Sequence, residues 1–113
     1  MDDEYVEAVL SLVESIPPGR AMSYGAIAEV LGMTLRRGGP RLVGAVLATY
    51  GGAVPWWRVV TASGRVPPGH EVAALRELVA EGCPLSADGK QVDMRRAAWR
   101  PAPGRPPTRY PSP

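Results

Sequence analysis

Side chains that could carry covalent chemistry are few, and they stand apart along the chain. Cys83 is the only cysteine and His70 the only histidine among the 113 residues. A cysteine nucleophile must lose its proton to a neighbouring base. Cys83 instead follows Glu81-Gly82 and precedes Pro84, a sequence typical of the exit from a helix. We therefore expect Cys83 to be an ordinary small apolar residue.

Metal and phosphate sites are not indicated either. A single cysteine excludes an internal disulfide and a cysteine-based metal cluster. No grouping of His, Cys, Asp or Glu shows the spacing of metal ligands, and no glycine-rich loop follows a predicted strand. The sequence thus predicts neither a metal nor another cofactor. His70, alone in a Pro-Gly loop, is more typical of a solvated residue than of a catalyst.

Two adjacent tryptophans, Trp56 and Trp57, favour recognition of a flat ring over a reaction. Stacking on an aromatic side chain is worth about 1 to 3 kcal/mol for a ring of the size of a nucleobase. Both tryptophans could also be core residues. Strand alternation would place them on opposite faces, so that one could be core and the other pocket.

The elements that must position these residues begin with three predicted helices. Apolar residues at helical spacing mark residues 3 to 16, and Pro17-Pro18-Gly19 ends this helix. Ser23 is a typical N-cap for a helix over residues 24 to 31, which Gly32 ends. Gly39-Pro40 opens a third helix, so that the second and third helices form a helix-turn-helix pattern. The buried stripe of the third helix is expected to comprise Val43, Val46, Leu47 and Tyr50.

Short elements alternate with loops in the second half. Val54 to Thr61 is β-branched and aromatic and predicts a strand, followed by a loop to His70. A fourth helix is predicted over residues 71 to 81, marked by Val72, Leu75, Leu78 and Val79. Asp88-Gly89 is a two-residue turn signal that could join residues 84–86 to 91–94 as a small hairpin. Residues 101–113 are largely proline and predict a disordered tail beyond a domain of residues 1–100.

Charge is unevenly distributed, although the net charge is only +2. The first helix is acidic, whereas residues 20 to 65 carry six arginines against Glu29 alone. A basic segment of this kind suits a polyanion, but the charges alone also fit a solvated face. Gly44, Ala45 and Ala48 of the third helix are small and would let its backbone approach either a neighbouring helix or a nucleic acid groove.

Four segments resemble one known family, the DNA O6-alkylguanine alkyltransferases. Pro55-Trp56-Trp57-Arg58-Val59 resembles the family's active-site strand, which reads Pro-Cys-His-Arg-Val. Residues 16 to 25 resemble the entry into its DNA-binding helices, and Arg41-Leu42-Val43-Gly44 is similar to Arg-Ala-Val-Gly of its recognition helix. Trp99-Arg100-Pro101 resembles the ending of the shorter alkyltransferase-like branch, which also places tryptophan at the cysteine position. The resemblance covers residues 5 to 100.

This resemblance implies a mainly α fold with a short strand and a hairpin, a winged helix-turn-helix-like DNA-binding domain of the alkyltransferase C-terminal type. It also implies that the chain is not an enzyme, because the indole of Trp56 cannot form a thiolate or accept an alkyl group by displacement. Glu81 falls where the family has its glutamate. Trp57, however, replaces the histidine that the branch usually keeps.

Residue roles at the DNA follow from the same resemblance. Tyr24 would rotate the phosphate of the target nucleotide outward, and Arg41 would fill the vacated stack. Gly44 and Ala45 would belong to the same DNA-binding and base-flipping surface.

The pocket for the alkyl group would be lined by Pro55, Trp56, Val59 and His70, whereas Arg58 would hold the local fold. The branch often places an arginine in the loop at the pocket rim. This chain has prolines and a glycine there, so either His70 or Arg65 could substitute.

Together these inferences predict a sensor that binds O6-alkylguanine in duplex DNA, flips it, and directs it to nucleotide excision repair through UvrA-like proteins. A helix-turn-helix transcription regulator is the alternative, with an operator and usually a dimer. Against this alternative, the recognition helix offers few long polar side chains for base edges besides Arg41. A third possibility is a remnant domain that binds nothing.

No apolar run approaches the roughly 20 residues that span a bilayer. The start, Met1-Asp2-Asp3-Glu4, is acidic where a signal peptide would be basic. We therefore expect a cytoplasmic monomer without a membrane partner, associated with the nucleoid when bound to DNA.

Overall fold

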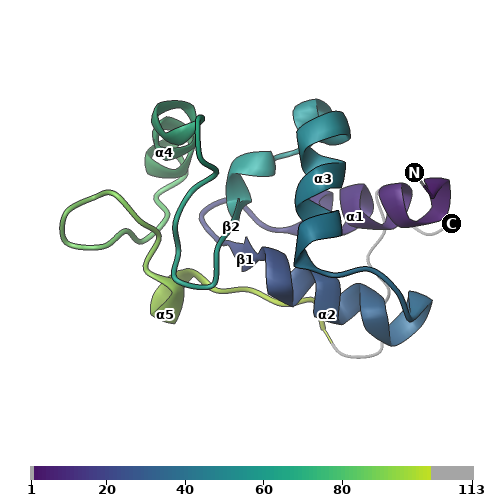
Figure 1. Cartoon of the computed structure of the whole chain (residues 1–113). Helices are drawn as coiled ribbons and strands as arrows, with labels where there is room; N and C mark the ends of the chain where they lie inside the picture. The colour runs from purple at the N-terminus through teal and green to yellow at the C-terminus, as the bar shows by residue number, and fades with distance from the viewer. Residues whose placement is uncertain (1, 103–113) are drawn as a thin grey trace, which may run out of the picture.

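The computed structural model describes residues 2–102, in which a short parallel sheet lies in the middle, with helices on either side of it (Figure 1). The buried apolar side chains form two hydrophobic clusters. The helices α1 (Asp3–Ser15), α2 (Tyr24–Leu35) and α3 (Pro40–Tyr50) surround the first cluster. The helices α4 (Glu71–Ala80) and α5 (Met94–Ala97) belong to the second. Strand β1 (Met22–Ser23) pairs with β2 (Val59–Val60), with Met22 opposite Val59.

Local sequence explains where the first three helices begin. The carboxylate of Asp2 accepts hydrogen bonds from the backbone N–H groups of Glu4 and Tyr5, at 3.0 and 3.4 Å, and so caps α1. Ser23 caps α2, because its Oγ accepts from the N–H of Ala26 at 3.0 Å. Pro40 occupies the first turn of α3, where its missing N–H removes no helical hydrogen bond.

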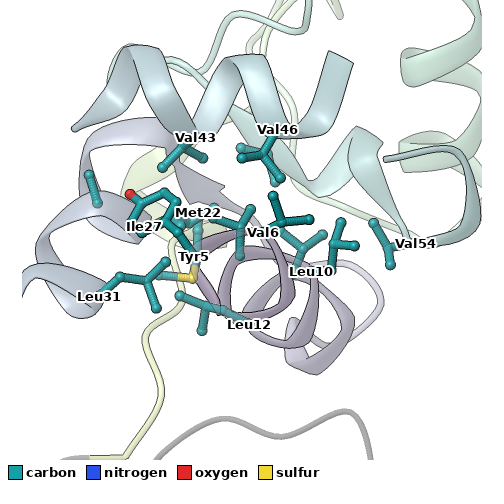
Figure 2. Close-up of a cluster of buried hydrophobic side chains, with 14 of the residues drawn as sticks. Tyr5, Val6, Leu10, Leu12, Met22, Ile27, Leu31, Val43, Val46 and Val54 are labelled. Atoms are coloured by element: carbon teal, nitrogen blue, oxygen red, sulfur yellow. The ribbon is translucent and has the colours of Figure 1, made fainter. Parts of the chain in front are cut away.

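Burial of one face of each helix holds the first cluster together. Figure 2 shows Val43 and Val46 of α3 pointing toward Tyr5 and Val6 of α1. Each apolar side chain of this size contributes about 1.5 to 3 kcal/mol when it is fully buried. The phenol oxygen of Tyr5 is buried and has no hydrogen-bond partner among the described residues. It lies beneath Gly38, in the connection between α2 and α3.

Residues from distant parts of the chain build the second cluster: Ala21, Val60, Val66, Ala74, Leu78, Cys83, Val92 and Ala97. The segment after α5 is tied back to the start of β1, since the N–H of Ala21 donates to the carbonyl of Ala97 and the N–H of Trp99 to the carbonyl of Ala21, at 3.0 and 2.9 Å. The burial of Cys83 agrees with its expected role as a small apolar residue.

The predicted strand over residues 54 to 61 is wrong for most of its length. Gly51–Ala53 and Trp56–Arg58 form two 3-10 helices, η1 and η2, and only β2 is extended. Pro55 has no N–H for a sheet ladder, and its carbonyl accepts the N–H of Arg58 at 3.1 Å, which closes the turn. The strand alternation expected for Trp56 and Trp57 therefore does not apply.

Two helix predictions also need correction. The helix α2 does not end at Gly32 but continues to Leu35, and the left-handed residue that ends it is Arg36, with φ of 58°. Tyr50, predicted to be buried on α3, is exposed. Two of the valines that mark α4 are also exposed. Because Ala74 and Leu78 form the buried face of α4, Val72 and Val79 remain 73% and 62% exposed.

The mainly helical fold class and the hairpin near the C-terminus are confirmed. Leu85 pairs antiparallel with Val92, and the N–H of Ser86 donates to the carbonyl of Gln91 at 2.8 Å. Residues 87 to 90, which contain the Asp-Gly signal, make the connection, as predicted. Beyond residue 102 the tail predicted to be disordered lies outside the described residues. Within residues 2–102, no helix has the length and apolar character that crossing a membrane requires.

Candidate nucleic-acid interface

A cavity of about 500 Å³ opens between α3 and the segment that leads into α4. Most of its wall is apolar or aromatic, and the phenol of Tyr24 and the imidazole of His70 supply polar groups. A wall of this composition suits a flat ligand with a few hydrogen-bonding groups. The lining residues are Tyr24, Gly44, Leu47, Ala48, Gly51, Gly52, Trp56, Pro67, Pro68 and His70.

One side of the cavity depends on how α2 begins. The Ser23 cap fixes the first turn of α2 and with it Tyr24, the first residue of that helix. Gly44 of α3 lies opposite, since a Cβ at this position would be 3.9 Å from the ring of Tyr24. Burial raises the pKa of Tyr24, so its phenol stays protonated at neutral pH and can donate a hydrogen bond.

Trp56 forms the opposite side and is contacted by two other rings. Its centroid lies 5.8 Å from that of Trp57, at an interplanar angle of 83°, and 5.8 Å from that of His70, at 64°. Edge-to-face arrangements at these distances are favourable for aromatic rings. Trp57 does not line the cavity, so Trp56 is the tryptophan available for stacking there.

Glu81, the residue after α4, accepts hydrogen bonds from three residues in two parts of the chain. Trp57 Nε1 donates to Oε2 at 2.9 Å, Arg58 Nη2 donates to Oε2 at 2.6 Å, and the N–H of Gly19 donates to Oε1 at 3.1 Å. Arg58 Nη1 also donates to the carbonyl of Ile16 at 2.8 Å. Burial alone would raise the pKa of Glu81, but these hydrogen bonds outweigh it and the pKa is lowered. Glu81 is therefore ionised at neutral pH, and its hydrogen bonds connect the end of α4 to Gly19, Trp57 and Arg58.

Among the described residues, no cysteine lies in the cavity wall. Cys83 is buried in the second cluster, and burial raises the pKa of its thiol. Residues 2–102 also contain no group of three or more His, Cys, Asp or Glu side chains that could hold a metal ion. The cavity has the shape and lining to hold a flat ring, and the described residues place no thiol in its wall.

Half of the predicted site residues line the cavity: Tyr24, Gly44, Trp56 and His70. Arg41 and Ala45 are exposed on α3, outside the cavity wall. Pro55 is half-buried at the start of η2 and does not line the cavity.

The prediction that Val59 lines the pocket is wrong. Its side chain is fully buried in the first cluster, because its backbone pairs with Met22 in the sheet, and it cannot line the pocket. Arg65 is exposed and bonded through its backbone to Thr61, and it is not part of the cavity wall either. Of the two candidates for the rim, His70 is the one that lines the cavity.

Several arginines of the basic segment, residues 20 to 65, bind other parts of the protein. Arg37 bonds Asp2 and Glu4 at the start of α1, Arg58 bonds Glu81, and Arg20 donates to two backbone carbonyls near residue 98. Arg41, in contrast, is exposed and forms no side-chain hydrogen bond or ion pair within residues 2–102. The positive charge available to a polyanion is thus smaller than the sequence indicates.

Sequence reasoning missed several lining residues. Gly51 and Gly52 were interpreted only as the break after α3, whereas Pro67 and Pro68 were placed in the loop at the pocket rim but not among the lining residues. Leu47 was assigned to the buried stripe of α3, yet it is half-buried and lines the cavity. Its spacing of three residues from Gly44 was the available signal, since such residues share a helix face.

The family model described as "6-O-methylguanine DNA methyltransferase, DNA binding domain" matches residues 4–81. The chain belongs to this family and to its alkyltransferase-like members. It is 30% identical over 103 residues to the DNA base-flipping protein of Vibrio parahaemolyticus, with 88% of this chain and 99% of that protein covered. It is 33% identical over 102 residues to the DNA base-flipping protein of Escherichia coli (strain K12), with 87% and 76% covered.

Two solved structures have folds similar to that of this chain. A crystal structure of S. pombe Atl1 in complex with damaged DNA containing O6-carboxymethylguanine is similar, with a TM-score of 0.73 and 26% identity. The match covers 89% of this chain and 99% of that one. A structure of S. pombe ATL in complex with DNA gives a TM-score of 0.71, also at 26% identity.

Proposed function

We propose that this protein binds O6-alkylguanine in duplex DNA, holds the flipped nucleotide in the cavity, and leaves the lesion chemically unchanged. The observation that carries the proposal is the position of Trp56. It forms a cavity wall at the place where the resemblance puts the alkyl-accepting cysteine. An aromatic ring there can stack on a base but cannot be alkylated by displacement.

The cavity suits such a ligand in size. Ligand sites commonly have volumes of about 300 to 1,000 Å³, and this one has about 500 Å³. Flipping costs a few kcal/mol and costs least when a lesion already weakens the base pair. Stacking on Trp56 would offset about 1 to 3 kcal/mol of that cost. A damaged base would therefore enter more readily than an undamaged one.

The exposed face of α3 supports a DNA-facing role beside the cavity. Arg41 lies three residues before Gly44, so both belong to one face of the helix. A long free side chain next to the cavity fits the role of filling the space that an extruded base leaves. Ala45 is small and exposed, which would allow the backbone of α3 to approach DNA closely.

We further propose that the bound lesion passes to nucleotide excision repair, because a protein that cannot remove the alkyl group must leave removal to other proteins. The relatives named DNA base-flipping proteins and the yeast complex with damaged DNA support the binding step. A transcription regulator is less well supported. Arg41 is the only charged residue of α3, which leaves little direct reading of base edges.

Two measurements test the proposal. Affinity is compared for one duplex with and without a central O6-methylguanine, at one stated salt concentration, because phosphate contacts make affinity depend on salt. We expect a preference for the lesion of about tenfold or more. Intact-mass spectra of the protein after incubation should be unchanged. Equal affinities would favour the regulator, and an added alkyl mass would identify an enzyme.

A further inference from the structure

The ring of Trp56 is contacted by residues connected to both ends of α4. His70, the residue before α4, contacts Trp56 directly. Glu81, the residue after α4, binds the indole N–H of Trp57, and the ring of Trp57 contacts Trp56. Trp56 is thus linked, through the ring of Trp57, to a hydrogen bond between two residues outside the cavity wall.

Trp57 is fixed more firmly than the ring it contacts. Its N–H bond to Glu81 is 2.9 Å, and the guanidinium of Arg58 lies over its ring, 5.6 Å from the centroid. Trp56 is half-buried, and its indole N–H makes no hydrogen bond within residues 2–102. An aromatic side chain without a polar anchor beside an open cavity can change rotamer unless neighbouring rings prevent it.

We propose that Trp57 is a positioning residue for lesion recognition. Its hydrogen bond to Glu81 holds its ring in place, and the edge of that ring keeps the indole of Trp56 in the orientation that stacks on a base. This inference rests on the proposed function of the cavity. It assigns to Trp57 an effect on selectivity, although Trp57 is not a lining residue.

The alternative role for Trp57 is to fill space, and the two roles differ in what they require. Space filling needs an apolar ring of similar size, which Trp57→Phe supplies. Positioning needs the N–H donor, which Trp57→Phe removes and Trp57→His can retain. Trp99→Phe is the matched control, because it makes the same chemical change at another half-buried tryptophan, outside the cavity wall.

The experiment measures the ratio of affinities for damaged and undamaged duplex in the full-length protein and its variants. We expect Trp57→Phe to lower this ratio by about 3- to 10-fold, as expected for loss of an oriented aromatic pair. Trp57→His and Trp99→Phe should stay within about twofold of the wild-type ratio. Thermal unfolding curves establish that each variant is folded at the temperature of measurement.

An unchanged ratio in Trp57→Phe would overturn the proposal, as would an equal loss of affinity for both duplexes. A loss in Trp99→Phe as large as that in Trp57→Phe would also overturn it. If Trp57→Phe does not fold, Glu81→Gln takes its place, because it weakens the acceptor of the same hydrogen bond without changing either ring. A lowered ratio then supports the proposal and an unchanged one rejects it.

A second measurement separates this inference from the proposed function. In protein labelled with 5-fluorotryptophan and free of DNA, the fluorine resonance of Trp56 should be single and narrow, and it should broaden or split in Trp57→Phe. If this difference is seen but the wild type does not prefer the lesion, the function is wrong and the positioning is right. If Trp56 is equally ordered in both proteins, the positioning is wrong.

Discussion

Arg58 and Glu81 form a salt bridge of 2.6 Å, and their side chains are only 12% and 13% exposed. Removing one partner of such a pair leaves a largely buried charge without compensation. We predict that Arg58→Ala lowers the free energy of unfolding by about 3 to 5 kcal/mol, as measured by urea denaturation. Arg96→Ala is the control, because its pair with Asp93 is more exposed, at 66% and 29%. Arg96→Ala should lower the free energy of unfolding by no more than about 1 kcal/mol. Equal losses in the two variants would contradict the prediction that the Arg58–Glu81 pair contributes more.

Stability should fall in acid partly because of Glu81. Its pKa in the folded protein lies below the ordinary value of 4.5, so the stabilisation is present above about that pH. It is lost as the pH falls through the folded-state pKa. Melting temperatures between about pH 7 and pH 3 test this, with Glu81→Gln as the comparison. The variant should be less stable at neutral pH, and its difference from wild type should shrink in acid. A constant difference would contradict the prediction.

Trp56→Ala should reduce the preference for damaged duplex by about 1 to 3 kcal/mol, because it removes the ring on which the base stacks. Affinity for undamaged duplex should change little, since that term comes mainly from phosphate contacts. The measurement is a pair of titrations at fixed salt. Trp99→Ala, which truncates a tryptophan outside the cavity wall, serves as the control. If it lowers the preference equally, Trp56 has no special role.

Arg41→Ala should weaken binding to damaged duplex more than binding to undamaged duplex, because the side chain is expected to fill the vacated stack only when a base is flipped. Arg65→Ala is matched to it, as both arginines are exposed and neither lines the cavity. Loss of charge alone reduces affinity for both duplexes to a similar degree. Equal losses for the two duplexes in Arg41→Ala would argue against flipping.

Gly38→Ala should destabilise the protein more than Gly69→Ala. Both glycines have positive φ, 89° and 85°, so both substitutions strain the backbone. A Cβ at Gly38 would overlap the buried ring of Tyr5, whereas one at Gly69 would meet no atom within 4 Å. We expect the clash to add about 1 to 3 kcal/mol to the loss at Gly38. The difference between the two unfolding free energies measures it.

Helices were predictable from sequence because their determinants are local. The caps at Asp2 and Ser23 and the proline at the start of α3 each act within one turn. The strand over residues 54 to 61 was not predictable in this way. Its residues have high β propensity, but Pro55 and the tertiary contacts of the two tryptophans place most of them in turns. The parallel pairing of β1 with β2 joins segments whose partnership no local pattern shows.

The candidate site was only partly predictable for a related reason. Tyr24, Gly44, Trp56 and His70 lie on the cavity wall, yet the resemblance, not the residue pattern, brought them together. Val59 was misplaced because a β-branched residue next to a pocket segment can face either the pocket or the core. The hydrogen bond of Trp57 to Glu81 was also missed, since a side-chain bond across 24 residues leaves no periodic signal.

The cavity lies between two clusters that differ in the sequence range of their contacts. Tyr24 and Leu47 pack against the first cluster, whereas Trp56 packs against the second, whose members extend from Ala21 to Ala97. Contacts between residues near in sequence close smaller loops and form sooner during folding. We therefore expect α1 to α3 to assemble first, with an exposed helix-turn-helix but only one side of the cavity. A partly folded protein of this kind could still bind DNA in general. Only the completely folded protein would bind damaged duplex more tightly than undamaged duplex.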